Sequence, residues 1–303
     1  MTASSDASEH AERFTLLRPL LFTIAYEILG SATESDDVLQ DAYLRWSQVD
    51  LSAVRDTKSY LAQLVTRQAL NALRADARRR EDYVGPWLPE PLLLEEQDPC
   101  ADVVLAESVS MAMLVLLETL SPDERAVFVL REVFGFDYSE IASAVDKSVS
   151  TVRQIAHRAR EHVQARRRRF APVDPEQNAR IAAEFMAAAS NGDVQTVMSM
   201  LAPDVVWTAD GGGKATAARR PIVGAQKVAT AIIGLGRWVR RMPGVRLEMV
   251  LCNSAPAVVV YRDDQLEGVF TVEIVDGKIT NFYAIRNPDK LTAIATAREI
   301  SRG

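Results

Sequence analysis

The pattern that most limits how this chain folds lies in residues 136–160, where a polar break joins two short amphipathic segments. In the first segment apolar side chains recur every three or four residues, which predicts a helix with one apolar face. These side chains are Tyr138, Ile141, Ala142 and Val145. The break at 146–148 ends this helix, and Ser148 or Ser150 is the expected N-cap of the next. The segment is therefore predicted to be a helix-turn-helix.

The second helix of this pair carries side chains suited to DNA on its outer face. Its inward positions are Val149, Val152, Ala156 and Ala159. Its outward positions are Thr151, Arg153, Gln154, His157 and Arg158. In a major groove, arginine binds guanine and glutamine binds adenine with two hydrogen bonds each. We therefore expect this helix to read a specific DNA sequence, with a solvated helical hairpin as the alternative.

Basic residues are concentrated in two helical segments of a chain that is acidic overall. The formal net charge is −6, whereas residues 146–169 hold eight basic and two acidic residues. Residues 74–80 hold four arginines and one aspartate. A charged run is usually a solvated surface, but basic charge gathered at two points of an acidic protein favours phosphate binding. The charge distribution thus supports DNA binding over the solvated hairpin.

Length and composition exclude several classes of protein. A chain of 303 residues is long enough for two or three domains, each with its own core. No apolar run approaches the roughly 20 residues of a membrane-spanning helix, and the polar N-terminus lacks the apolar segment of a signal peptide. Cys100 and Cys252 are too far apart for metal-ligand spacing. We therefore expect a cytoplasmic protein without a membrane segment, a metal site or a cofactor.

The order of helical and proline-rich segments predicts two helical domains joined by a linker. Residues 9–82 have helical periodicity, with Gly30 ending one helix and Thr33 opening the next. Residues 83–101 are rich in proline and are expected to form an extended linker. Residues 102–170 are helical again and include the helix-turn-helix.

Residues 176–300 are predicted to form a third domain that combines helices with an antiparallel sheet. Helices are expected at 178–190, 194–201 and 225–237. Strands are expected at 204–208, 245–251, 257–261, 266–275 and 278–285. Asp276-Gly277 is typical of a tight hairpin turn between the last two strands. The predicted fold class is therefore two all-α domains followed by one α+β domain.

Residues 10–169 resemble a bacterial extracytoplasmic-function (ECF) RNA polymerase sigma factor. The segment ESDDVLQDAYLRW at 34–46 is similar to sigma region 2.2, and YLAQLVTRQALNALR at 60–74 is similar to regions 2.3 and 2.4. The segment LSPDERAVFVLR at 120–131, with the helix-turn-helix after it, is similar to region 4. The resemblance implies a region 2 helical bundle, a region 4 helix-turn-helix, and promoter-specific initiation with RNA polymerase core enzyme.

Three further motifs resemble those of the ECF41-type subgroup, which carries a C-terminal SnoaL-like extension. They are WLPEP at 87–91, DGGGK at 210–214 and NPDKL at 287–291, in that order along the chain. This resemblance implies a cone-shaped NTF2-like fold for the C-terminal domain, in agreement with its α+β pattern.

The resemblance also implies roles for polar residues of the helical domains. Those expected to face the polymerase are Asp36, Asp37, Gln40, Asp41 and Arg45. Those expected at the −10 promoter element are Arg67, Asn71, Arg74 and Arg78. Those expected at the −35 element are Arg153, Gln154, His157 and Arg158 on bases, and Lys147, Thr151 and arginines 166–169 on phosphates. The acidic face at 36–41 fits a basic protein partner, although a helix N-terminus alone accounts for Asp36 and Asp37.

The C-terminal domain is expected to regulate the other two domains by packing on the linker. The expected contacts of the linker are Trp87, Leu88, Pro89, Glu90 and Pro91. Those of the C-terminal domain are Asp210, Gly211, Gly212, Gly213 and Lys214, with Asn287, Pro288, Asp289, Lys290 and Leu291. Trp87 is the expected buried anchor, since large aromatic side chains dominate interface energies. Local packing of the linker on itself is the alternative.

Two other functions stay open on the sequence alone. One is a conventional DNA-binding regulator that does not use polymerase core. The other is an isomerase-like or cyclase-like enzyme, because NTF2-like folds commonly enclose an apolar pocket that admits a small ligand. Asp204, Asp210 and Tyr283 are the nominal acid–base residues of such a pocket. Since a fold alone carries no function, we predict a sigma factor without enzymatic activity.

Overall fold

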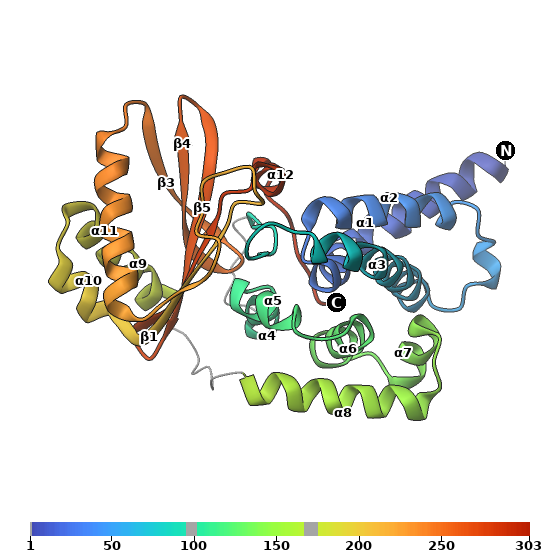
Figure 1. Cartoon of the computed structure of the whole chain (residues 1–303). Coiled ribbons are helices and arrows are strands. Elements are labelled where there is room, and N and C mark those ends of the chain that lie inside the picture. Colours follow the sequence, from blue (N-terminus) through green and yellow to red (C-terminus); the bar gives the residue numbers. More distant parts are fainter. Residues whose placement is uncertain (1, 95–101, 167–174) are drawn as a thin grey trace.

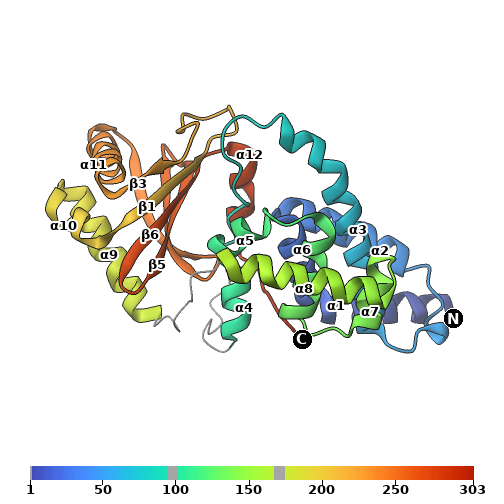
Figure 2. The same ribbon diagram turned by 60° about the horizontal axis from the view of Figure 1, so that its bottom comes forward.

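The computed structural model describes residues 2–94, 102–166 and 175–303, without the side chains of residues 2–7, 77–81 and 175. A helical part and a sheet domain lie side by side, and the linker and the last residues of the chain run between them (Figure 1). The turned view in Figure 2 shows the same division, with the C-terminus against the helical part. Each predicted region is therefore in contact with the others.

The first helical domain consists of α1 (Thr2–Leu29), α2 (Ala32–Trp46), the 3-10 turn η1 (Leu51–Ala53) and α3 (Thr57–Glu81). Gly30 ends α1 as predicted, with a φ of +70° that favours glycine. The prediction that Thr33 opens the next helix is wrong. Ser31 is the N-cap of α2, because its hydroxyl oxygen accepts the Glu34 amide at 3.1 Å. The amide and hydroxyl of Thr33 donate instead to Glu90 of the linker.

The second helical domain consists of α4 (Val103–Ser108), α5 (Met111–Leu117), α6 (Pro122–Phe128), the π-helical turn η2 (Val129–Val133), α7 (Tyr138–Val145) and α8 (Val149–Arg166). The predicted helix-turn-helix is α7 and α8. Asp146 ends α7 with a φ of +55°, and Ser148 is the N-cap of α8, since its hydroxyl oxygen accepts the Thr151 amide at 3.2 Å. The predicted inward positions of α8 are buried except Val149, which is 36% exposed because it is the first residue of the helix.

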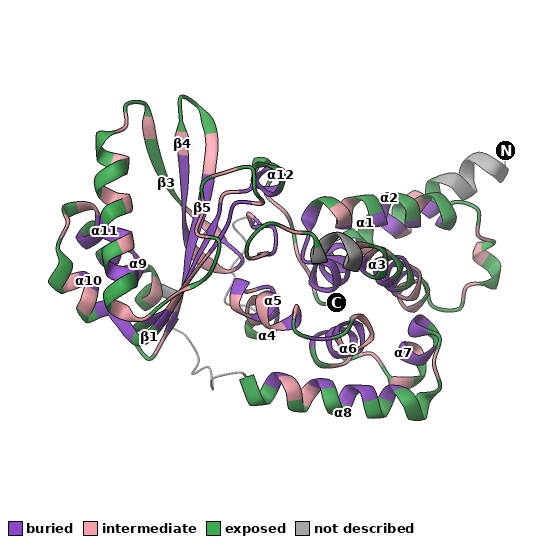
Figure 3. Cartoon of the chain, in the orientation of Figure 1, coloured by how far each residue is buried: buried purple, intermediate pink, exposed green. Residues whose placement is uncertain are grey.

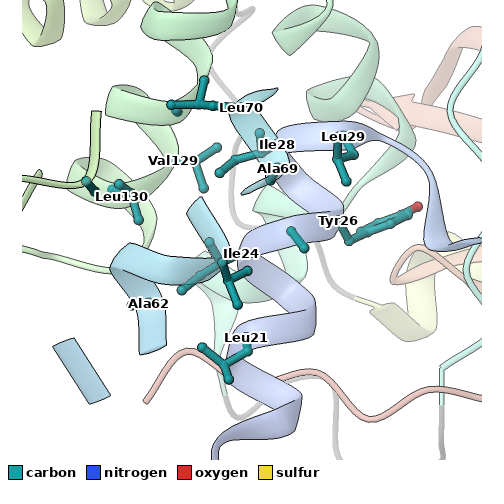
Figure 4. Packing of buried hydrophobic residues seen from close by; sticks show 14 of the residues in the cluster. Leu21, Ile24, Tyr26, Ile28, Leu29, Ala62, Ala69, Leu70, Val129 and Leu130 are labelled. Atoms are coloured by element: carbon teal, nitrogen blue, oxygen red, sulfur yellow. The ribbon is translucent and has the colours of Figure 1, made fainter. Parts of the chain in front are cut away.

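The two helical domains share one continuous hydrophobic core. The α3 helix packs on α1 and α2, and its other side packs on α6 and α7. Figure 4 shows the place where they meet: Ile24 of α1, Ala69 and Leu70 of α3, and Val129 of η2 belong to the same cluster. Burial of apolar surface contributes about 25 cal/mol per Å². The helical domains are therefore held together by packing as well as by the linker.

The C-terminal domain is built from α9 (Pro175–Asn191), α10 (Val194–Met200), β1 (Leu201–Asp210), β2 (Ile222–Val223), α11 (Ala225–Arg241), β3 (Val245–Cys252), β4 (Ala255–Arg262), β5 (Gln265–Val275) and β6 (Lys278–Ile285). A short helix α12 (Pro288–Leu291) and the 3-10 turn η3 (Thr292–Ala295) follow. The strand order is β2-β1-β6-β5-β4-β3, with β1 and β6 parallel and the other pairs antiparallel. Asp276 and Gly277 both have positive φ, as the predicted hairpin turn requires.

The two faces of this sheet pack against different parts of the chain. Helices α9, α10 and α11 cover one face (Figure 1), where Phe270 and Phe282 lie in the core of the domain. The opposite face carries Val269 and Tyr283, which pack with Leu88 of the linker. Successive side chains of a strand point to opposite faces, so β5 and β6 contribute to both cores. Figure 3 accordingly shows β4 and β5 as largely buried.

The predicted fold class, two helical domains followed by an α+β domain, is confirmed. The main difference is β1, which begins at Leu201 and is longer than the predicted strand because it pairs with both β2 and β6. Within the described parts of the chain, none of the helices combines the length and the apolar character needed to cross a membrane.

Candidate DNA, polymerase and regulatory surfaces

The outer face of α8 is open, as predicted from the sequence. The exposed side chains on it are Thr151, Arg153, Gln154, His157 and Arg158. The Arg153 guanidinium lies 5.5 Å from the centre of the Tyr138 ring, and this contact holds it beside α7. His157 Nδ1 lies 3.2 Å from the Glu161 carboxylate, one turn along the helix. The face therefore presents hydrogen-bonding side chains at the spacing that a major groove requires.

Two residues expected to hold phosphates already interact with other residues of the chain. Lys147 Nζ lies 3.0 Å from the carboxylate of Asp123, which is in the first turn of α6. The Thr151 hydroxyl lies 2.8 Å from the Ser148 hydroxyl in the cap of α8. Arg166 is the last residue of α8, and the predicted arginines 167–169 lie outside the described residues.

The residues expected at the −10 element lie along one side of α3, and this side faces the second helical domain. Arg67, Asn71 and Arg74 are exposed at intervals of four and three residues. Arg67 Nη2 donates to the carbonyl of Ser143 in α7 at 2.9 Å, and Arg74 Nη2 donates to Asp123 Oδ1 at 2.5 Å. The side chain of Arg78 lies outside the described residues. Arg67 and Arg74 are thus bound to the second helical domain, although their side chains stay exposed at the surface.

Asp123 links the two sets of DNA-facing residues, because it interacts with both Arg74 and Lys147. Burial opposes its ionisation, but the hydrogen bonds from Arg74 and Lys147 hold the pKa of this carboxyl below its ordinary value. The carboxylate therefore occupies two cations that are expected to bind DNA. The contact therefore stabilises the arrangement in which α3 packs against α6 and α7. We call this the closed arrangement of the two helical domains.

The face of α2 expected to meet the polymerase is exposed and contains an apolar residue that the sequence reasoning missed. The exposed residues are Asp37, Gln40, Asp41, Leu44 and Arg45. Leu44 is 55% exposed. The sequence could have revealed Leu44 as exposed, because a residue one helical turn after Gln40 and Asp41 lies on the polar side of the helix. Asp36 is less exposed, because it pairs with Arg18 at 3.0 Å and with Arg298 of the C-terminal segment at 2.6 Å.

The predicted regulatory motifs meet at a buried carboxylate, Asp210. Tyr83 Oη donates to Asp210 Oδ1 at 2.6 Å, and the amide of Leu88 donates to Oδ2 at 2.8 Å. Lys290 Nζ lies 2.7 Å from Oδ2, and this ion pair is almost fully buried. Burial and the hydrogen bond to Asp210 raise the pKa of Tyr83. The Asp210 cluster, defined as Tyr83, Leu88, Asp210 and Lys290, joins all three motifs.

Residues around the Asp210 cluster complete the contact between linker and C-terminal domain. Trp87, the expected buried anchor, is only half-buried, and Leu88 is the fully buried residue instead. Lys290 Nζ lies 3.9 Å from the centre of the Trp87 ring, a cation–π contact. Asn287 Nδ2 donates to Tyr83 Oη at 2.8 Å. Gly212 has a φ of +56° and lies so close to Asn287 that a side chain would collide with it. Lys214 lies at the edge, where it forms an exposed ion pair with Asp289.

Glu90 of the linker is bound to the first helical domain. The Ser31 hydroxyl donates to Glu90 Oε1 at 2.8 Å, and the Thr33 amide donates to Oε2 at 3.0 Å. Tyr26 Oη donates to the Glu90 carbonyl at 2.7 Å. The linker therefore contacts region α1–α2 through Glu90 and the C-terminal domain through Leu88.

The sequence reasoning missed Asn253, which contacts three parts of the chain at once. It lies in the turn between β3 and β4, with a φ of +51°. Its Nδ2 donates to Tyr26 Oη at 2.7 Å and to the carbonyl of Val109 at 2.8 Å, and its Oδ1 accepts the Leu92 amide at 2.9 Å. The Asn-Ser pair between the two strand segments signals a turn. The hydrogen-bond partners of Asn253 come from distant segments, so the local sequence does not identify them.

A second buried polar group joins the two helical domains. The Ser108 hydroxyl donates to Glu27 Oε1 at 2.6 Å, and Arg125 Nε donates to the Glu27 carbonyl at 2.8 Å. Burial raises the pKa of the Glu27 carboxyl to about 8, although Ser108 and Arg125 act in the opposite direction. Glu27 is on α1, Ser108 is on α4 and Arg125 is on α6, so this group holds the closed arrangement.

The C-terminal domain contains an apolar cavity of about 120 Å³ between α9, α11 and the sheet. The three residues nominated as acid–base groups do not converge on it. Asp204 is exposed on β1, Asp210 binds the linker, and Tyr283 lies on the opposite face of the sheet. The geometry therefore gives no support to a catalytic site made of these three residues.

Comparisons with known proteins identify the family of the chain. The Sigma-70 region 2 family model matches residues 14–79, and the Sigma-70 region 4 family model matches residues 110–163. The chain is 37% identical over 292 residues to the ECF RNA polymerase sigma factor SigJ of Mycobacterium tuberculosis, and the match covers 92% of each chain. The chain belongs to the ECF RNA polymerase sigma factors. It is an alternative sigma factor, a protein that directs transcription initiation.

Two further similarities extend over nearly the whole sigma factor. It is 32% identical over 278 residues to the probable sigma factor SigI of the same organism, a match that covers 90% of this chain and 92% of SigI. The crystal structure of M. tuberculosis SigJ superposes with a TM-score of 0.74, at 32% identity, over 93% of this chain and 98% of SigJ. The resemblance to an ECF sigma factor is therefore confirmed, and the conventional regulator is not supported.

Proposed function

We propose that this sigma factor regulates its own promoter recognition, with the C-terminal domain holding regions 2 and 4 in a closed arrangement. In this proposal α2 binds RNA polymerase core, α3 binds the −10 element and α8 reads the −35 element. The observation that carries the proposal is the Asp210 cluster, which joins the C-terminal domain to the linker between the two DNA-binding regions. Release of this contact frees the linker and lets the regions move apart.

The charged groups of the interface support a closed state that must open. Arg67 and Arg74 interact with α7 and α6, so these two side chains must exchange protein partners for DNA when α3 binds a promoter strand. A base held outside the DNA stack needs polar and basic side chains around it. The C-terminal segment adds a further restraint, because Arg298 binds Asp36 on the proposed polymerase face.

Two lysine ion pairs in the C-terminal domain differ mainly in burial, which makes them a matched pair for testing the proposal. Lys290 and Asp210 are almost fully buried, and loss of one partner of a buried pair costs about 3–5 kcal/mol. Lys214 and Asp289 are both more than half exposed, and an exposed pair contributes about 0.2–1 kcal/mol. Lys290→Met should therefore release the linker, whereas Lys214→Met should not.

The test is run-off transcription with purified core polymerase and full-length protein, from the promoter upstream of the protein's own operon. We expect Lys290→Met to raise transcription by roughly 5-fold or more, the range of ordinary coupling between sites, and Lys214→Met to leave it unchanged. If Lys290→Met releases the linker but both variants give equal transcription, regulation by this contact is refuted. Absence of core-dependent transcription from any variant would refute the proposed promoter contacts.

Linker release is measured independently by labelling Cys252. This thiol is buried where β3 bridges to Leu93 of the linker, and burial raises its pKa to about 12. With Cys100 replaced by serine, Cys252 is the one cysteine of the chain. Lys290→Met should accelerate its reaction with a thiol reagent, and Lys214→Met should not.

The proposed polymerase face is tested by Leu44→Ser. Leu44 lies one helical turn after Gln40 and Asp41 and is the exposed apolar residue of this polar face. Loss of such an anchor should weaken binding to core polymerase by about fivefold or more. The matched control is Val223→Ser in β2, since both side chains are 55% exposed. Equal affinity of the two variants for core would exclude Leu44 from the interface.

We infer in addition that the cavity of the C-terminal domain admits a small ligand. Its apolar lining and its enclosure between α9, α11 and the sheet support this inference, in line with the usual character of ligand pockets. The same cavity is not proposed as an enzymatic site, because the nominated acid–base residues lie elsewhere.

A further inference from the structure

The interior of the cavity is suited to one apolar ring. Its walls are formed by Phe185 of α9, Ile232 and Leu235 of α11, and Val258, Phe270 and Phe282 of the sheet. An apolar cavity of about 150 Å³ in another protein stays free of water and binds benzene. A cavity of about 120 Å³ with an open end is therefore large enough for an aromatic ring or a short branched hydrocarbon.

The charged residues that line the cavity carry an excess of positive charge. Arg262 and Arg286 share one carboxylate, Glu267, at 2.7 Å and 3.3 Å. Arg240 also borders the cavity, and among the described residues that line it Glu267 is the one acidic group. Arg286 and Glu267 are partly buried, with 18% and 23% of their side chains exposed, whereas the Arg262 side chain is 43% exposed. Two guanidinium groups with one carboxylate leave a partly desolvated positive charge, which favours an anion.

We propose that this cavity binds a small aromatic or branched-chain carboxylic acid. The apolar body of the acid occupies the space between Phe185, Phe270 and Phe282, and its carboxylate binds Arg262 and Arg286. Guanidinium groups suit this role, since they bind carboxylates with two parallel hydrogen bonds.

The position of Arg286 connects this site with the linker. The amide of Arg286 donates to the carbonyl of Asp210 at 2.7 Å, and its guanidinium donates to the carbonyl of Thr216 at 2.7 Å. An acid that draws the Arg286 guanidinium away from Glu267 therefore moves a residue whose backbone amide is hydrogen-bonded to Asp210. This consequence rests on the proposed function, whereas binding of the acid does not, because binding needs neither polymerase nor DNA.

Calorimetric titration of the free full-length protein tests the site with two probes of the same shape. The probes are 4-phenylbutyrate and its uncharged counterpart 4-phenylbutan-1-ol. We expect the acid to bind at least about tenfold more tightly than the alcohol, the effect of one charge-assisted contact. Arg262→Gln should reduce this preference to about twofold or less, since the surplus charge is lost. Arg246→Gln, an exposed arginine on β3 that does not line the cavity, should keep it.

The location of the probe is tested separately from its charge. Leu235→Trp should abolish binding of both probes by filling the cavity, and bound acid should shift the methyl NMR signals of Ile232 and Val258 in the unchanged protein. Equal affinity for acid and alcohol would overturn the ligand class. Binding that leaves these methyl signals unmoved, or no saturable binding of either probe, would overturn the site. A failure here would leave the sigma role intact, because that role is measured by transcription.

Discussion

The two helices that are expected to contact promoter DNA, α8 and α3, differ in what covers their polar faces. The apolar side of α8 is buried against α5, α6 and α7, and its polar face is open. The α3 helix lies between α1 and α2 on one side and α6 and α7 on the other, so Arg67 and Arg74 interact with region 4. A basic helix face is thus open or closed according to which elements pack beside it.

This difference implies an order of events at a promoter. In our proposal the −35 element can be read by the protein as it stands, because Arg153 and Gln154 are exposed. Binding of the −10 element then requires Arg67 and Arg74 to leave their partners in region 4 first. The linker and the C-terminal domain control that step in our proposal, since they contact both regions.

The largest effect that separates the two helices is expected for Arg153→Ala. Loss of a two-hydrogen-bond contact to a base should weaken binding to −35 duplex DNA by about 1–3 kcal/mol and relax the preference at one base pair. Binding is measured with free protein and a set of single-base variants of the site. Arg180→Ala is the control, because Arg180 is exposed on α9 in the C-terminal domain. A uniform loss over all variants would make Arg153 a phosphate contact instead.

A smaller effect is expected for Asp123→Asn, which removes the carboxylate that holds Arg74 and Lys147. Half-exposed ion pairs of this kind contribute about 0.2–1 kcal/mol each, so single-stranded −10 DNA should bind severalfold more tightly. Fluorescence anisotropy with a labelled −10 oligonucleotide measures this. Glu161→Gln, which removes the carboxylate paired with His157 on α8, should leave −10 binding unchanged. No gain for Asp123→Asn would show that this ion pair does not restrain α3.

A separate effect, on stability and not on DNA binding, concerns pH and the buried group between the helical domains. The folded protein keeps a proton on Glu27 up to about pH 8, whereas the unfolded chain loses it near the ordinary pKa of 4.5. The unfolded state therefore binds fewer protons between these values, and stability falls as pH rises from about 4.5 to about 8. Glu27→Gln should flatten this slope in urea unfolding measured across that range.

Glu12→Gln serves as the control for this measurement, since Glu12 is exposed on the same helix. It should keep the slope of the unchanged protein. An equal slope in the Glu27→Gln variant would mean that other groups cause the pH dependence.

The sequence alone predicted the elements of the fold and the family. Periodicity placed α7 and α8, and the caps and turns at Gly30, Ser148 and Asp276-Gly277 followed from local backbone preferences. The outward positions of α8 were predicted correctly, because a helix pair with one apolar stripe leaves the other face open. These features depend on residues within one or two helical turns.

The contacts between distant segments could not be read in this way. The prediction that Thr33 opens α2 is wrong, because Thr33 binds Glu90 of the linker. The sequence around Asn253 does not reveal that its side chain binds Tyr26 and Val109. The linker and the motifs at 210–214 and 287–291 were expected to meet from a resemblance, since nothing in their local sequence names a partner. The structure brings them together at Asp210, although their roles in regulation stay a prediction.

The sequence by itself thus determined which helices and strands form, which faces are apolar, and which protein family the chain joins. Only the tertiary structure decided that Arg67 and Arg74 of α3 bind region 4, that Asp210 and Lys290 form a buried pair, and that two arginines share one carboxylate at the cavity. The physical reason is the range of the forces involved. Helix and turn preferences act between near neighbours, whereas burial and ion pairing depend on which distant segments the packed core brings together.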